Sequence, residues 1–116
     1  DVDETMTFQA TFPSGVIGNC STTFNAAGMG RIRAHAQKGW FGLEPAFNYG
    51  GIKGARSDGK PLEFPATDHF AAEMDDFSQC ILNKKPSKVS GEEGLRDVKL
   101  MMAIYESART GKVVKV

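Results

Sequence analysis

The spacing of apolar residues changes once along this chain, and that change constrains the fold more than any other feature. Between residues 5 and 43 apolar and polar side chains alternate, whereas in residues 70–81 the apolar ones recur every three or four positions. A period of two is typical of a half-buried strand, and a period near 3.6 is typical of an amphipathic helix. The sequence therefore predicts strands first and helices afterwards.

The alternating part predicts an antiparallel sheet. Two alternating runs, residues 5–12 and 16–24, are joined by Pro13-Ser14-Gly15, which predicts a hairpin. The run 40–44 carries large apolar side chains on both faces, so we expect it inside the sheet or covered by a partner. In chain order, extended segments are expected at residues 5–12, 16–24, 31–36, 40–44, 47–52, 61–64 and 113–116.

The first predicted helix begins near Thr67 or Asp68 and ends at Lys84-Lys85-Pro86. Its apolar stripe consists of Phe70, Met74, Phe77 and Ile81. The acidic residues Glu73, Asp75 and Asp76 fall outside this stripe, so we interpret them as a solvated face and not as paired catalytic carboxylates.

The second predicted helix opens at Ser90-Gly91-Glu92-Glu93, which fits a capping box. In that motif the Ser90 hydroxyl accepts a hydrogen bond from the Glu93 amide. Gly111 is placed to end the helix in the left-handed conformation. The apolar stripe of this helix consists of Leu95, Val98, Met102 and Tyr105, widened by Met101, Ile104 and Ala108.

Strands followed by helices predict an α+β fold: a mainly antiparallel β-sheet with two C-terminal helices packed on one side. A doubly wound nucleotide-binding fold is excluded because strands and helices do not alternate. Gly28-Met29-Gly30-Arg31-Ile32-Arg33 begins like a dinucleotide fingerprint, but Arg33 stands where the third glycine or alanine is needed and the segment leads into a strand. We therefore expect no cofactor-binding residue in this chain.

Composition excludes several classes of partner. The 116 residues hold 14 Lys and Arg against 14 Asp and Glu, with the signs interspersed, which argues against a nucleic-acid partner. No apolar run approaches the roughly 18 residues of a membrane span, and the acidic start at Asp1 does not fit a signal peptide. The chain has no initiator methionine, which suggests that it is a segment of a longer protein.

No catalytic or metal-binding set can be defended from spacing. The two cysteines, Cys20 and Cys80, are far apart and are expected to be half-buried apolar side chains. The two histidines, His35 and His69, have no ligand-spaced partner. Trp40, with Phe41 and Phe47 near it, fits a ligand platform, a core strand or a dimer interface, and the sequence leaves these three open.

Several stretches, taken in order, carry a resemblance to a known family. They are Val2-Asp3-Glu4-Thr5, Phe12-Pro13-Ser14-Gly15, His35-Ala36-Gln37-Lys38-Gly39-Trp40-Phe41, Glu44-Pro45-Ala46-Phe47, Val89-Ser90-Gly91-Glu92-Glu93-Gly94 and Ala103-Ile104-Tyr105-Glu106-Ser107-Ala108-Arg109-Thr110-Gly111. This pattern resembles the C-terminal part of the Gfo/Idh/MocA family of sugar oxidoreductases, closest to its glucose-fructose oxidoreductase branch. The resemblance covers nearly the whole chain.

The resemblance implies an N-terminal Rossmann domain that binds NAD or NADP and is absent from this chain. Residues 1–116 would then be a single C-terminal substrate and oligomerisation domain, whose open sheet forms one wall of the sugar site and packs against another subunit. The implied reaction is hydride transfer between a nicotinamide and a sugar or polyol carbon. No catalytic residue carries over, because the family's Gly-rich fingerprint and catalytic lysine lie upstream of Asp1. We therefore expect the isolated chain to bind no cofactor and to be inactive.

The segment 25–31 matches a family segment that supplies substrate-facing side chains, so the resemblance points to Asn25, Met29 and Arg31 as substrate-binding candidates. The competing hypothesis is a stand-alone interaction module that dimerises through its sheet. A third hypothesis, a small sugar-binding domain, would require stacking on Trp40 or Tyr49. The compartment, cytoplasm or bacterial periplasm, stays open.

Overall fold

The computed structural model describes residues 2–116, in which the chain divides into two compact units. Unit 1 combines the N-terminal part up to Ala26 with Lys88–Val116, and unit 2 comprises Ala27–Ser87. Strands precede helices in chain order and all strand pairs are antiparallel, so the predicted α+β class is confirmed. The two units are described separately below.

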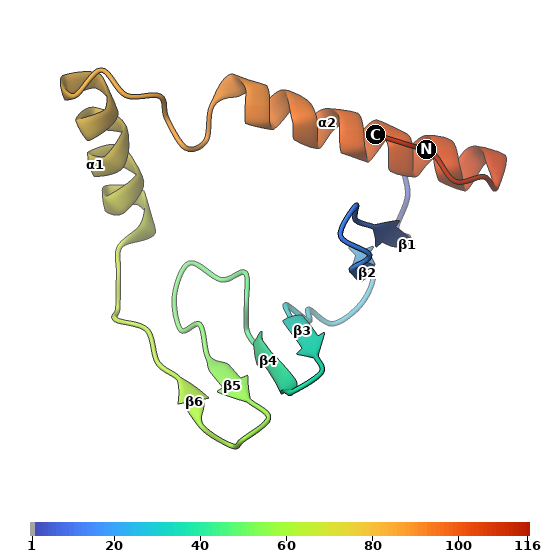
Figure 1. Cartoon of the computed structure of the whole chain (residues 1–116), viewed down its shortest axis with the longest axis horizontal. Coiled ribbons are helices and arrows are strands. Elements are labelled where there is room, and N and C mark those ends of the chain that lie inside the picture. Colours follow the sequence, from blue (N-terminus) through green and yellow to red (C-terminus); the bar gives the residue numbers. More distant parts are fainter. Residues whose placement is uncertain (1) are drawn as a thin grey trace. The chain divides into compact units, whose positions relative to one another are not determined.

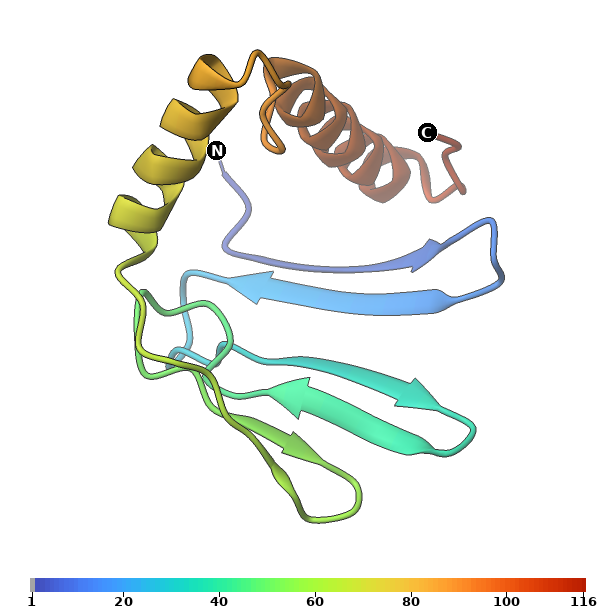
Figure 2. The same ribbon diagram turned by 60° about the vertical axis from the view of Figure 1, so that its left-hand side comes forward.

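Unit 1 contains the predicted hairpin, formed by β1 (Thr5–Thr11) and β2 (Ile17–Thr23). Figure 2 shows the two strands as long antiparallel arrows. Met6, Phe8 and Ala10 are less exposed than the residues between them, which confirms the alternation. The opposite face carries a ladder of polar pairs, including Thr5 and Thr23, whose hydroxyl oxygens lie 2.8 Å apart.

Unit 1 also contains α2 (Gly91–Thr110), the longer helix of Figure 1. Gly111 ends it in the left-handed conformation with φ 66°, as predicted. The predicted capping box is wrong: Ser90 is the N-cap, but its side chain makes no capping hydrogen bond. The Ser90 hydroxyl instead bonds to the Glu92 carboxylate, and this bond, with Glu92's own backbone amide, holds the pKa of Glu92 below its ordinary value. A hydroxyl donating to a charged acceptor makes a stronger bond than one shared with a neutral amide.

One side-chain bond joins the start of the chain to α2 within this unit. The Tyr105 hydroxyl donates to Asp3 Oδ1 at 2.7 Å. This bond, and then the negative charge of Asp3, raise the pKa of Tyr105 above its ordinary value. The residues before β1 are therefore held against the helix by a specific polar contact.

Unit 2 is built around a four-stranded antiparallel sheet in the order β3-β4-β5-β6 (Figure 1). The strands are β3 (Ile32–Ala36), β4 (Gly39–Leu43), β5 (Gly54–Arg56) and β6 (Pro61–Leu62). β4 pairs with β3 on one side and with β5 on the other, so it is interior, as its large apolar residues on both faces predicted.

The register of this sheet separates two chemically different faces, because successive side chains along a strand point to opposite sides. We call one the cationic face; it consists of Arg31, Arg33, His35, Trp40, Gly42, Glu44, Lys53 and Ala55. We call the other the apolar face; its apolar side chains are Ile32, Ala34, Ala36, Phe41, Leu43 and Leu62.

Unit 2 ends in α1 (His69–Leu82), which begins where the sequence predicts. The N-cap is Asp68, whose carboxylate accepts from the backbone amides of Phe70 and Ala71, both at 3.1 Å. Phe70 also contacts Tyr49 from the loop between β4 and β5, with the ring centres 5.1 Å apart. The remaining apolar stripe of α1 is exposed.

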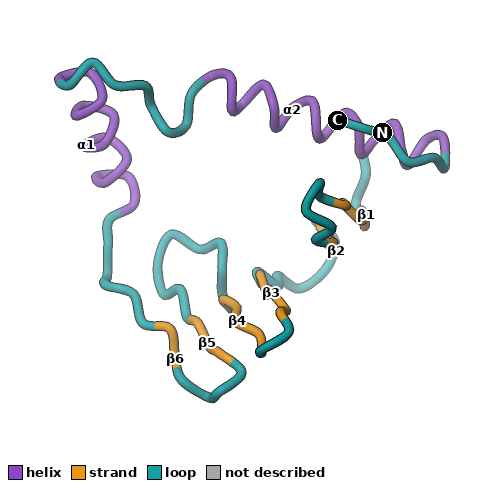
Figure 3. Tube along the Cα trace, in the orientation of Figure 1, coloured by secondary structure: helices purple, strands orange, loops and turns teal. Residues whose placement is uncertain are grey.

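Two predicted strands are wrong. Residues 47–52 form a loop, and the strand that pairs with β4 begins only at Gly54 (Figure 3). The pair Gly50-Gly51, with Gly51 at φ 68°, favours a loop over an extended strand. Residues 113–116 are irregular as well, and just before them the Ser107 hydroxyl donates a hydrogen bond to the Lys112 carbonyl at 2.7 Å.

Burial within the described residues is sparse. Ala46 is the one apolar side chain there that is buried, with 9% of its surface exposed. Cys80 is half-buried, as expected, and its thiol lies 3.6 Å from the Pro86 carbonyl oxygen. The expectation for Cys20 is wrong, since this thiol is exposed on β2. Most apolar surface of both units is thus available for contact with other protein.

Candidate functional site

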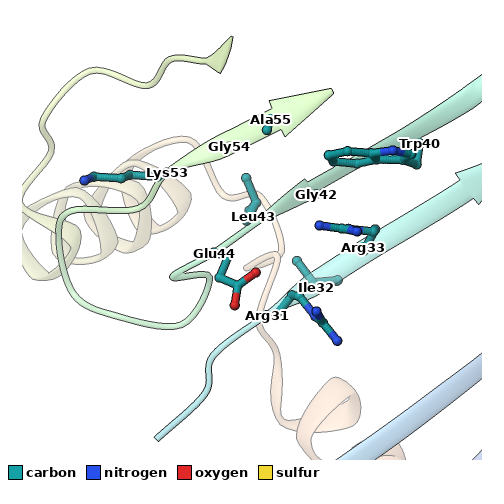
Figure 4. A pocket seen from close by; sticks show the side chains of 10 residues that line it. All are labelled: Arg31, Ile32, Arg33, Trp40, Gly42, Leu43, Glu44, Lys53, Gly54 and Ala55. Atoms are coloured by element: carbon teal, nitrogen blue, oxygen red, sulfur yellow. The ribbon is translucent and has the colours of Figure 1, made fainter. Parts of the chain in front are cut away.

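The cationic face of unit 2 is hollowed around the middle of β4. The hollow has a volume of about 150 Å³ and is shown from close by in Figure 4. Its lining residues are Arg31, Ile32, Arg33, Trp40, Gly42, Leu43, Glu44, Lys53, Gly54 and Ala55. Seven of these ten belong to the cationic face as defined above.

Gly42 forms the floor of this hollow. It stands between Trp40 and Glu44 along β4, and it pairs with Arg33 on one side and Ala55 on the other. A side chain at this position would meet the backbone: a Cβ atom built on Gly42 would lie 2.6 Å from the Ile32 carbonyl oxygen. Glycine at this position therefore lets the backbones of β3 and β4 approach closely beside the hollow.

Arg33 and Trp40 form a cation–π contact at this site. The guanidinium carbon of Arg33 lies 4.1 Å from the centre of the Trp40 ring, and Figure 4 shows the guanidinium below the indole. Such a cation–π contact contributes about 0.5–1 kcal/mol at an exposed position. The contact also holds the plane of the guanidinium group in one orientation, whereas the side chain of an exposed arginine without such a contact is free to rotate.

The charges around the hollow are unbalanced. Arg31, Arg33 and Lys53 carry three positive charges, and Glu44 carries the one negative charge of the lining. Within residues 2–116, none of these four side chains forms an ion pair or a hydrogen bond. Only main-chain groups connect Glu44 and Lys53, through a bond of 2.8 Å from the Glu44 amide to the Lys53 carbonyl.

A second hollow, of about 470 Å³, lies at the turns of the same unit. It is more open than the first hollow. Its lining combines Phe41 and Leu62, from the apolar face of unit 2, with the polar side chains of Lys38 and Ser57. Its arginine, Arg56, is already paired with Asp58 at 2.8 Å. This hollow therefore offers less free charge than the one on the cationic face.

The three substrate-binding candidates fall in different parts of the structure. Asn25 belongs to unit 1, where its side-chain amide donates to Glu4 Oε2 at 2.9 Å. Met29 and Arg31 belong to unit 2, where Met29 is 71% exposed in the loop before β3. Of the three, Arg31 lines the hollow on the cationic face.

Sequence reasoning missed Arg33, Glu44 and Lys53 as members of one site. A signal existed for Arg33, because Arg31 and Arg33 alternate on one side of a predicted strand that returns through Lys38-Gly39 to Trp40. No such signal existed for Lys53, because the strand that follows it in the structure was predicted at residues 47–52, before Lys53. The structure brings Arg31 and Arg33 together with Trp40 and does not bring any histidine or cysteine into a ligand cluster among the described residues.

Residues 2–116 contain no group of three or more His, Cys, Asp or Glu side chains that could hold a metal ion. Neither of the two described helices is long and apolar enough to cross a membrane.

Known proteins are similar to this chain over nearly its whole length. A family profile described as "Oxidoreductase family, C-terminal alpha/beta domain" matches residues 2–116. A D-xylose 1-dehydrogenase [NADP(+)] of Haloarcula marismortui is 28% identical over 117 residues, covering 97% of this chain and 32% of that protein. A D-xylose 1-dehydrogenase (NADP(+)) 2 of Haloferax volcanii is 27% identical over 120 residues, covering 98% of this chain and 37% of that protein.

A solved structure shows the same fold. The chain superposes on aldose-aldose oxidoreductase from Caulobacter crescentus, solved in complex with glycerol, with a TM-score of 0.89 and 33% sequence identity. The match covers 100% of this chain and 36% of that structure's chain. The chain thus spans about a third of the length of the relatives it matches.

Proposed function

The chain belongs to the Gfo/Idh/MocA oxidoreductase family, as its C-terminal α/β domain, and from this premise we propose that it is the substrate-side domain of an NADP-dependent sugar oxidoreductase. The observation that carries the proposal is the match over residues 2–116. Relatives named as NADP-dependent D-xylose dehydrogenases support the cofactor and the sugar class.

In this proposal the cofactor is held by a separate Rossmann domain that precedes the chain. The described residues do not fit the cofactor themselves. Their strands are all antiparallel, and the glycine-rich segment 28–30 leads into β3 and not into a helix. A dinucleotide needs a glycine-rich turn between a strand and a helix whose N-terminus binds the pyrophosphate. No reaction step is therefore assigned to this chain alone.

The part of this chain in the reaction would be to shape one wall of the sugar site. We retain Asn25, Met29 and Arg31 as the residues that contact the substrate. Arg31 has a charged side chain free of protein partners among the described residues, whereas the Asn25 amide already bonds to Glu4. Arg31 is thus the residue of the three best suited to contact a sugar hydroxyl.

The apolar face of unit 2 supports a further role in self-association. Ile32 on the edge strand β3 and Phe41 on the interior strand β4 are 53% and 56% exposed on that face. Exposed apolar patches of this kind usually mark contacts with another protein. The competing function, a stand-alone interaction module, uses the same face and no cofactor.

Titration with NADP⁺ separates these two functions. The gene product that contains this chain together with any preceding sequence is expected to bind NADP⁺ saturably, whereas the 116-residue chain alone is expected not to bind it. The matched control is the same pair of proteins titrated with AMP, which lacks the nicotinamide. Tight NADP⁺ binding by the 116-residue chain, or no binding by the complete gene product, would reject the proposal.

A further inference from the structure

We propose that the hollow on the cationic face of unit 2 is a binding site for a small oxyanion, a carboxylate or a phosphate, held by Arg33 and Arg31. The proposal rests on the geometry of β3, β4 and β5 and not on the sugar reaction. It assigns a ligand to the pair of Arg33 and Trp40, which the proposed function leaves without a role.

The stack of Arg33 on Trp40 prepares the guanidinium for an anion. Stacking occupies the face of the guanidinium plane, with its central carbon 4.1 Å from the ring centre. The N–H donors lie along the edge of that plane, where they match the two oxygens of a carboxylate or phosphate. No side chain or carbonyl among residues 2–116 accepts a hydrogen bond from them. The donors are thus oriented and unused.

Arg31 places a second cation next to the first. It lies two residues earlier and on the same face, so the two Cα atoms are about 7 Å apart along the strand. Like charges on one face repel each other, and an oxyanion bound by both guanidinium groups replaces this repulsion with attraction. Lys53 also lines the hollow, but Figure 4 shows its side chain extending away from Arg33 and Trp40, and Glu44 carries the one carboxylate of the lining.

The size of the hollow suits a small ion. Its volume of about 150 Å³ has room for inorganic phosphate or a short carboxylic acid.

An acidic polypeptide is the alternative ligand. Its carboxylates would pair with the same arginines, and both tryptophan and arginine are frequent in the centres of protein interfaces. The observations favour the small ion, since the cations surround a recess floored by glycine and not a flat or protruding surface. Binding of a polypeptide is therefore treated as an outcome that contradicts the proposal.

The test uses isothermal titration calorimetry on the complete gene product that contains residues 1–116. This protein is titrated with phosphate and, separately, with acetate, while chloride keeps the ionic strength constant. We expect saturable binding of at least one of the two ions. The ion with the lower dissociation constant identifies the preferred chemistry.

Three variants locate the site. Arg31→Gln leaves the stack intact and is expected to weaken binding several-fold, and Arg33→Gln is expected to weaken it at least tenfold. Arg33→Lys keeps the charge without the planar fork and should also bind more weakly than the parent. Arg96→Gln is the matched control, because Arg96 pairs with Glu93 at 3.1 Å in unit 1, and its affinity should equal that of the parent.

Circular dichroism verifies that each variant has the helix content of the parent. The proposal is overturned if neither ion produces a saturable change, or if Arg31→Gln and Arg33→Gln bind as tightly as the parent. Equal binding by Arg33→Lys would reject the bidentate arrangement. A saturable response to poly-glutamate with none to phosphate or acetate would replace the small ion with an acidic polypeptide.

Discussion

The Tyr105 hydroxyl donates a hydrogen bond to the Asp3 carboxylate at 2.7 Å, across 102 positions of sequence. This bond ties the segment before β1 to the third quarter of α2 within unit 1. No sequence pattern predicts this bond, because Asp3 lies outside the alternating run and Tyr105 belongs to a predicted apolar stripe. It is nevertheless the contact with the clearest measurable consequence.

Removing Asp3 should lower the pKa of Tyr105. In a Tyr49→Phe background Tyr105 is the one remaining tyrosine of the sequence, so ultraviolet absorbance follows its ionisation alone. Asp3→Ala removes the hydrogen bond and the charge that raise this pKa, and the value should fall toward the ordinary 10.0. The Tyr49→Phe protein with Asp3 intact is the control, and equal pKa values in both proteins would contradict the bond.

The same shift predicts how unit 1 responds to alkaline pH. Because the pKa of Tyr105 is raised in the folded protein, its contribution to stability is complete below the ordinary value of 10.0. It is lost as the pH rises through the folded value. Thermal unfolding of the parent and of Tyr105→Phe should therefore converge with increasing alkalinity, and a constant difference up to the highest pH would show that ionisation plays no part.

The caps of the two helices should differ in strength. Asp68→Ala removes a carboxylate that accepts two backbone amides and should destabilise α1 by about 1 kcal/mol. Ser90→Ala removes a side chain that makes no capping bond and should cost α2 less. Amide hydrogen exchange measures both effects, at Phe70 and Ala71 for α1 and in the first turn of α2. An equal loss of stability in the two variants would indicate that Ser90 caps α2 as the capping box predicts.

Gly42 should tolerate no side chain. Gly42→Ala places a Cβ atom 2.6 Å from the Ile32 carbonyl oxygen, so β3 and β4 must separate. We expect a loss of about 1–3 kcal/mol in the stability of unit 2. The control is Gly28→Ala, where a Cβ atom meets nothing within 4 Å, and its stability should stay close to that of the parent. Chemical denaturation followed by Trp40 fluorescence compares the three proteins.

Gly94 should respond in the opposite direction. It lies inside α2, its Cβ position is empty to 4 Å, and alanine favours a helix over glycine by about 1 kcal/mol. Gly94→Ala should therefore raise the thermal stability of α2. Gly111→Ala should lower it, because Gly111 has φ 66°, a conformation that disfavours a side chain. Circular dichroism on heating gives both signs, and a stabilising Gly111→Ala would contradict the assigned helix end.

Much of the fold could be predicted because local rules agree with the final structure. The hairpin, the start of α1 at Asp68 and the end of α2 at Gly111 each follow from a short-range pattern that tertiary contacts do not override. The predictions were wrong where a local pattern and other contacts favour different structures. Residues 47–52 are predicted as a strand, yet Gly50-Gly51 and the ring contact between Tyr49 and Phe70 favour a loop.

The site was predictable only in part, for a related reason. Arg31 was reached through the resemblance, whereas its neighbours on the cationic face depend on strand register, and Lys53 joins the site only because β5 begins at Gly54. The floor at Gly42 could not be foreseen either, since a glycine inside a strand indicates a close approach without naming what approaches.

The measurement that tests the central proposal most directly is NADP⁺-dependent oxidation of aldoses, D-xylose among them, followed by the absorbance of NADPH. The complete gene product that contains residues 1–116 is predicted to form NADPH with at least one aldose, and the isolated 116-residue chain at the same concentration is predicted to form none. NADPH formation by the isolated chain, or its absence with the complete gene product across the aldoses, would contradict the assignment of this chain as the substrate-side domain of a sugar oxidoreductase.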